Sequence, residues 1–179
     1  MPLNQTALAF YVKTTAAHEC GHMTVLYTKQ RLKGLNFFPH ATAFDGSSGI
    51  VETDTPPLGK EDCVALAASI VGEEICLGQY DEKRIQDDRQ TAARFTDRPL
   101  ESFIDEARTI IQKNLAFFSL LHIAVRKRLR RVLAEAYSLP QEKFAGLPDK
   151  ISVMTLSEVE EVHRKARELT TGSPSVWPS

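Results

Sequence analysis

The arrangement of apolar residues along the chain predicts its first elements. Apolar side chains recur at helical spacing through 3–29, which indicates a helix that Gly34 ends. A short apolar run at 35–38 then stops at Pro39, as is typical of an edge strand. A second strand is expected at 49–53. The first third of the chain therefore predicts one long helix followed by a small sheet.

The rest of the chain has helical patterning. A mostly apolar helix is expected at 60–77, and a short helix at 87–95. The pattern over 99–137 is long enough for one helix or for two in succession. Thr155 followed by Glu158 is the signature of a capping box at the start of a final amphipathic helix. The predicted class is mainly α with a small β-sheet (α+β).

Composition narrows the possible classes of protein. A chain of 179 residues with 42% hydrophobic residues suits one globular domain, which we expect over 1–169, with a disordered tail rich in Ser, Thr and Pro over 170–179. A net charge of −1 provides no general attraction to nucleic acid or to anionic membranes. The sequence has neither a signal-peptide pattern nor an apolar run of about 20 residues, so we expect a soluble, cytoplasmic protein without a membrane partner.

The most informative motif is HECGH at 18–22, an HExxH sequence inside the first predicted helix. Residues four apart project from one face of a helix, so the imidazoles of His18 and His22 can bind one ion. Glu19 is turned by about 100° from His18 and can reach a metal-bound water instead. This pattern predicts a zinc (Zn²⁺) site in which Glu19 is the general base.

Two histidines leave a catalytic zinc site incomplete, because such a site has three protein ligands and one open position. One known solution takes a Glu from a second helix, which nominates Glu73 or Glu74. Another takes an Asp, which nominates Asp87 or Asp88. Spacing alone leaves these alternatives open.

The motifs together resemble the peptidase domain of the FtsH family, membrane-anchored ATP-dependent zinc metalloproteases. HECGHM at 18–23 is similar to the family's HEAGHA, and LNFFP at 35–39 to its strand that ends in a Pro-Arg-Gly turn. GEEICLG at 72–78 is similar to its AEE-x-x-x-G, and DDRQTA at 87–92 to its N-D-x-x-x-A. The likeness covers about residues 7–147, and the metal motif is its most specific part.

The resemblance implies a role for each candidate. Asp88 becomes the third zinc ligand, Asp87 takes the place of the family's Asn as a helix cap, and Glu73 neighbours the ligands without binding the ion. A zincin-like active-site helix followed by a helical bundle is the implied fold. The implied activity is that of a zinc metalloendopeptidase that cleaves unfolded or flexible peptides, with a homo-oligomer left open. The strand expected to pair with substrate consists of Leu35, Asn36, Phe37 and Phe38.

The sequence also departs from the family. Cys20, Met23 and His40 replace the family's residues around the site, and no Walker A phosphate loop occurs, so we expect an ATP-independent peptidase. Two rival hypotheses remain. One is a metal-stabilised interaction module without proteolysis, and the other is a nucleic-acid-associated protein that uses the basic helix 126–131. A basic run in a neutral chain is more typical of a solvated face, which favours the metal site.

Overall fold

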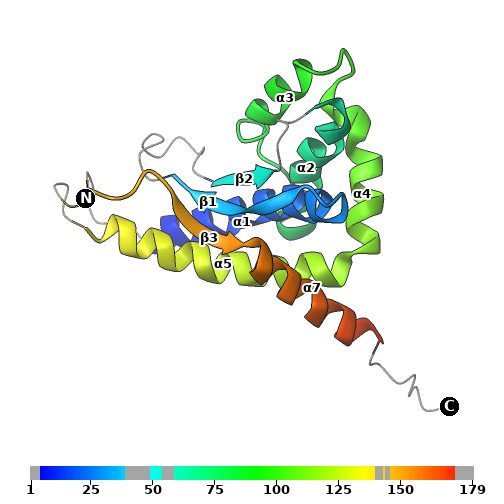
Figure 1. Ribbon diagram of the computed structural model, residues 1–179. Coiled ribbons are helices and arrows are strands. Elements are labelled where there is room, and N and C mark those ends of the chain that lie inside the picture. The colour runs from blue at the N-terminus through cyan, green and yellow to red at the C-terminus, as the bar shows by residue number, and fades with distance from the viewer. Residues whose placement is uncertain (1–4, 39–48, 54–58, 140–142, 144–145, 172–179) are drawn as a thin grey trace.

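The computed structural model describes residues 5–38, 49–53, 59–139, 143 and 146–171. Helices dominate this part of the chain, and a small antiparallel sheet accompanies them (Figure 1), so the expected α+β class is confirmed. The α-helices are α1 (Gln5–Thr28), α2 (Cys63–Leu77), α3 (Gln86–Ala93), α4 (Ile104–Lys113), α5 (Leu115–Tyr137) and α7 (Leu156–Thr171). The strands are β1 (Leu32–Phe37), β2 (Gly49–Thr53) and β3 (Ile151–Thr155), and short 3₁₀ turns, η1 (Lys60–Asp62) and η2 (Leu100–Phe103), precede α2 and α4.

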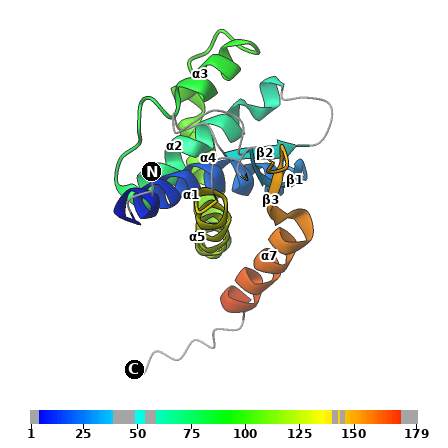
Figure 2. The same ribbon diagram turned by 90° about the vertical axis from the view of Figure 1, so that its left-hand side faces the viewer.

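Helix α1 occupies the middle of the molecule, where the sheet, α2 and α5 surround it (Figures 1 and 2). Every residue from Thr14 to Leu26 is buried, so this half of the helix has no face exposed to solvent. The helix was predicted over 3–29 and ends at Thr28, but Gly34 is not the residue that ends it. The chain leaves the helix after Thr28 through Gln30, which has a positive φ of 57°, and Gly34 already belongs to β1.

The sheet corrects the expectation of an edge strand at 35–38. Its order is β2-β1-β3, so β1 is the central strand and both of its neighbours are antiparallel to it. Leu35 pairs with Val51 on one side and with Met154 on the other. Strand β3 was not predicted, and Phe38 follows β1 rather than belonging to it.

The remaining helices follow the sequence pattern closely. Helix α2 ends at Gly78, whose φ of 78° is the left-handed conformation that favours glycine at a helix C-terminus. The long pattern over 99–137 divides at Asn114, so it forms two helices after η2. Helix α7 runs to Thr171, two residues into the expected tail, and the rest of that tail lies outside the described residues. Among the described helices, none has the length and apolarity needed to cross a lipid bilayer.

Candidate metal centre

The two histidines of the HExxH motif face each other from successive turns of α1. Both side chains are buried, and their rings meet edge to face with centroids 4.8 Å apart. The Nε2 atoms of His18 and His22 lie 3.2 Å from each other. The helix therefore presents two ring nitrogens to one point, as the spacing predicts.

Asp88 completes this group from the first turn of α3. One carboxylate oxygen, Oδ2, lies 3.5 Å from Nε2 of His18, and the other, Oδ1, lies 3.5 Å from Nε2 of His22. Asp88 is buried, whereas Asp87 is exposed, because adjacent residues of a helix point about 100° apart. Asp87 does not cap α3 either, since the residue at the N-cap is Ile85. The His18, His22 and Asp88 group can bind a metal ion, and the described residues contain no second such group.

The spacing of these donor atoms fits a tetrahedral ion. Zinc binds nitrogen and oxygen ligands at about 2.0–2.1 Å, and the edge of a tetrahedron is about 1.63 times that bond length, or ~3.3–3.4 Å. The separations from His18 to His22, from His18 to Asp88 and from His22 to Asp88 are 3.2, 3.5 and 3.5 Å. The three side chains therefore outline one face of a zinc-sized tetrahedron, and the fourth corner is left for another ligand.

Each histidine is held through the ring nitrogen that faces away from this point. Nδ1 of His22 lies 2.8 Å from the backbone oxygen of Ala65, which can only accept, so Nδ1 of His22 must donate. Nδ1 of His18 lies 2.9 Å from Oε1 of Glu73. These contacts place the proton on Nδ1 and leave the Nε2 lone pairs free to bind a cation, as in many zinc sites.

The structure also separates the two candidate glutamates. Glu73 is fully buried, contacts His18, and accepts the backbone N–H of Asp81 at its second oxygen, Oε2, at 2.7 Å. Glu74 instead forms an ion pair with Arg108 at 2.9 Å. Burial raises the pKa of Glu73, and the N–H of Asp81 lowers it in part. Glu73 thus holds a histidine rather than joining the donor group, in agreement with its expected place beside the ligands.

Ser69 is a further member of the site that sequence reasoning missed. Its hydroxyl donates to Oδ2 of Asp88 at 2.6 Å, which fixes the carboxylate and leaves Oδ1 as the less engaged oxygen. The only sequence signal was its position on α2. Ala65, Ser69 and Glu73 are four residues apart, so they lie along one face of that helix and contact His22, Asp88 and His18 in turn.

Glu19 lies beside the donor group without belonging to it. Its side chain is buried, and no hydrogen bond joins its carboxylate to another residue that the structure describes. Burial raises the pKa of Glu19 well above its ordinary value, and the negative charge of Asp88 raises it further, while Arg84 lowers it. A carboxylate in such surroundings has an increased affinity for a proton, which is the property that a general base needs.

His18 has the opposite shift. Burial is the main cause that lowers its pKa to about 3, and the neighbouring His22 lowers it further. The imidazole is therefore neutral at physiological pH. A neutral imidazole is the form that binds zinc, so the site is ready for a cation without losing a proton first.

The expected substrate strand has no edge to offer. Leu35, Asn36 and Phe37 pair through their backbones with both β2 and β3, so β1 cannot add a substrate peptide as a further strand. Phe38 lies beyond the strand. The expectation that this segment pairs with substrate is wrong, because β3 arrives from more than a hundred residues later in the chain and takes the free edge.

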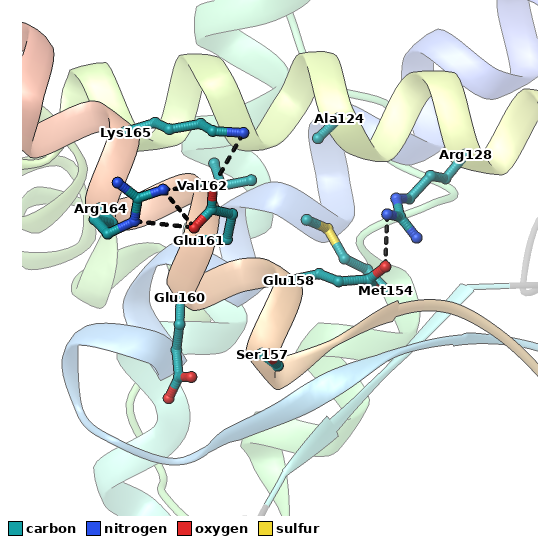
Figure 3. Close-up of a pocket in the computed structure, with 10 residues that line it drawn as sticks. All are labelled: Ala124, Arg128, Met154, Ser157, Glu158, Glu160, Glu161, Val162, Arg164 and Lys165. Atoms are coloured by element: carbon teal, nitrogen blue, oxygen red, sulfur yellow. Dashed lines mark hydrogen bonds and ion pairs between the residues drawn. The ribbon is translucent and has the colours of Figure 1, made fainter.

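The basic run at 126–131 is partly neutralised. A groove of about 690 Å³ lies beside this run, and Arg128 forms an ion pair with Glu158 there at 2.6 Å. Figure 3 shows the residues that line the groove. Arg164 and Lys165 both contact Glu161 in the same groove. Outside it, Arg131 pairs with Glu135 at 2.8 Å. Two of the arginines of the run therefore have carboxylate partners, which weakens the case for a phosphate-binding helix.

Comparisons with known proteins do not assign a function to these residues. No protein-family model matches the chain, and neither the curated proteins nor the solved structures contain a match. The likeness of short motifs to the FtsH peptidases stays a prediction, and the geometry of the His18, His22 and Asp88 group is the observation on which a function has to rest.

Proposed function

We propose that this protein is a zinc-dependent peptidase in which His18, His22 and Asp88 hold the ion and Glu19 is the general base. The observation that supports it is the convergence of two imidazoles and one carboxylate at tetrahedral spacing, with Glu19 buried beside them. Two imidazole nitrogens and one carboxylate oxygen at tetrahedral spacing form a donor set that suits zinc. Three protein ligands with one open position are typical of catalytic rather than structural zinc.

The chemistry divides between the ion and the chain. When bound, zinc would polarise the scissile carbonyl and make a water molecule more acidic. Glu19 accepts the proton from that water and returns it to the leaving amine, for which its raised proton affinity suits it. His18 and His22 keep their orientation, since Glu73 and the Ala65 carbonyl hold their Nδ1 atoms.

A flexible peptide is the substrate class that this arrangement favours. Within the described residues β2 pairs with β1 alone, so the other edge of β2 has unpaired backbone groups. Because β2 also contacts α1, the helix that carries the two histidines, we place an extended substrate peptide at this edge. Backbone pairing at a strand edge requires an extended chain and tolerates many sequences. Flexible peptides should therefore be cleaved, and stably folded proteins should resist.

The test is Glu19→Gln, which preserves the shape of the side chain and removes its ability to accept a proton. We expect zinc content to stay at one ion per chain, while cleavage of an unstructured peptide falls on the order of a hundredfold or more. Glu74→Gln is the matched control, because Glu74 lies on α2 and pairs with Arg108 away from the donor group.

Two outcomes would contradict the proposal. Unchanged cleavage in Glu19→Gln would remove Glu19 from the chemistry. Full zinc content combined with the absence of cleavage in the unaltered protein, over a panel of flexible peptides, would favour the metal-stabilised interaction module instead.

A further inference from the structure

Arg84 is a buried cation next to the metal centre that the proposed chemistry does not use. It lies in the loop between α2 and α3, and only 12% of its side chain is exposed. Its guanidinium reaches across to α1, where one terminal nitrogen donates to the hydroxyl of Thr15 at 3.1 Å and the other to the hydroxyl of Thr14 at 2.8 Å. These threonines lie one helical turn before His18 and Glu19.

The third nitrogen of this side chain points to the carboxylate that holds His18. Nε of Arg84 lies 3.6 Å from Oε1 of Glu73, the same oxygen that contacts Nδ1 of His18 at 2.9 Å. This Nε is buried and has no hydrogen-bond partner among the described residues. A buried N–H without a partner is costly, so its direction toward Glu73 needs an explanation.

We propose that Arg84 is a positioning residue for the metal centre, which holds Glu73, and through Glu73 the imidazole of His18, in the metal-binding orientation. Three donors of one planar fork are involved: two fix the arginine to α1, and the third faces Glu73. The N–H of Asp81, from the same loop, holds the other oxygen of Glu73. The loop between α2 and α3 thus restrains the carboxylate from both sides.

The charges around the site lead to the same conclusion. Glu19, Glu73 and Asp88 are three buried carboxylates, so their full ionisation requires three positive charges, of which a divalent ion would supply two. Arg84 supplies the remaining positive charge from a place where it contacts Glu73 rather than the donor atoms. A buried carboxylate without such a partner would be strongly destabilised. The positive charge of Arg84 therefore stabilises the ionised form of Glu73 beside His18.

This inference rests on metal binding at His18, His22 and Asp88 but not on proteolysis, so it is tested by metal affinity. The variant is Arg84→Met, which keeps an unbranched side chain and removes the charge and the fork. We expect the dissociation constant for zinc, measured by competition with a chromogenic chelator, to rise about tenfold or more, the effect of losing an outer partner of a ligand. In the cobalt-loaded variant, the visible absorption bands should shift because His18 is less well oriented.

A double-mutant cycle separates action through Glu73 from a general structural role. If Arg84 acts through Glu73, Arg84→Met should change zinc affinity much less in a Glu73→Gln background than in the unaltered protein. Arg89→Met is the matched control. Arg89 is also an arginine with two carboxylate partners, Glu82 and Glu101, but it is more exposed, at 28%, and does not contact the site. Its loss should leave zinc affinity unchanged.

The variants also distinguish the ways in which the inference can fail. Zinc affinity that is unchanged or higher in Arg84→Met would overturn it, because the guanidinium would then be irrelevant or would mainly repel the ion. Equal effects of Arg84→Met with and without Glu73 would overturn it as well. If His18→Ala leaves zinc binding intact, the metal site itself is wrong. Should Arg84→Met fail to fold in chelator, the double variant Thr14→Val, Thr15→Val removes both anchors of the fork and should weaken zinc binding in the same direction.

Discussion

Gly21 of α1 lies directly against the backbone of Ala68 of α2, so closely that no side chain fits between them. A Cβ atom at Gly21 would lie 2.0 Å from the carbonyl oxygen of Ala68. The contact is reciprocal along the crossing, since a Cβ at Gly72 would lie 2.3 Å from the carbonyl oxygen of Ala17. Neither glycine has a positive φ, so the close approach of the two helices, rather than an unusual backbone conformation, is the reason that these positions require glycine.

This crossing matters for the site because α2 carries its supports. Ala65, Ser69 and Glu73 face α1 and α3 from one side of α2 and contact His22, Asp88 and His18. A small separation of α1 and α2 would lengthen the contacts of Ala65 with His22 and of Glu73 with His18, and would move Asp88, which Ser69 holds, away from the histidines. The glycines therefore connect helix packing to metal binding.

Gly21→Ala should consequently destabilise the protein and weaken the site at once. The new methyl group meets backbone atoms, which cannot rotate away, so we expect a loss of about 3 kcal/mol in the free energy of unfolding. Urea denaturation monitored by circular dichroism measures it. Zinc affinity should fall in the same variant.

Gly59→Ala is the control for this experiment. The three atoms nearest to a Cβ at Gly59 would all belong to the flexible carboxylate of Glu61, and the φ of −131° at Gly59 is open to any residue. The change should be close to neutral. Similar losses for both alanine variants would contradict the role assigned to the helix crossing.

The choice between the two aspartates can be tested directly. Asp88→Asn removes the negative charge of a donor and should weaken zinc binding at least ten- to a hundredfold, on the scale of losing a partner of the site or more. Asp87→Asn is its matched control, because Asp87 is the adjacent residue of the same helix turn and is exposed. Isothermal titration with zinc measures both. Metal loss in Asp87→Asn with none in Asp88→Asn would refute the arrangement in α3.

Metal removal should lower the stability of the protein. Zinc binds the folded site and not the dispersed ligands of the unfolded chain, so a hundredfold excess of zinc over its dissociation constant stabilises by about 2.7 kcal/mol. We expect the melting temperature to fall on addition of a chelator and to recover when zinc is restored. The His18→Ala, His22→Ala double variant should melt at one temperature in both conditions, and a persistent difference would place the stabilising zinc elsewhere.

The capping box of α7 predicts a pH-dependent contribution to stability. The backbone N–H of Thr155 is the main cause that holds the pKa of Glu158 below its ordinary value, and the Thr155 hydroxyl and Arg128 add to it. A carboxylate with a lowered pKa stabilises the fold above its ordinary pKa near 4.5, and this contribution disappears as the pH falls below that.

Glu158→Gln should therefore cost ~0.5 kcal/mol at pH 7 and much less at pH 3. Thermal melts of the variant and the unaltered protein across this range give the difference. Glu160→Gln, an exposed change on the same helix, controls for the loss of a surface charge. A difference for Glu158→Gln that stays constant with pH would show that the ionised carboxylate is not what caps the helix.

Local patterns in the sequence were sufficient wherever the physics is local. The helical repeat and the HExxH spacing predicted that His18 and His22 face one ion, because the helix alone fixes their separation. The end of α2 at Gly78 and the capping box at Thr155 depend on residues no more than four positions apart. The break at Asn114 was left open by the pattern, since two successive helices can share one apolar stripe.

Tertiary structure decided what depends on distant residues. Strand β1 looked like an edge because its short apolar run stops at Pro39, whereas the strand that pairs with its second side, β3, comes from more than a hundred residues later. The selection of Asp88 over Asp87 required the rotation of α3 about its axis, which places one of them 3.5 Å from both histidines. The contact of Ser69 follows from where α3 packs on α2, and the contacts of Arg84 follow from how closely the loop after α2 approaches α1. The approach of α2 to α1 depends on two glycines whose purpose no short-range pattern reveals.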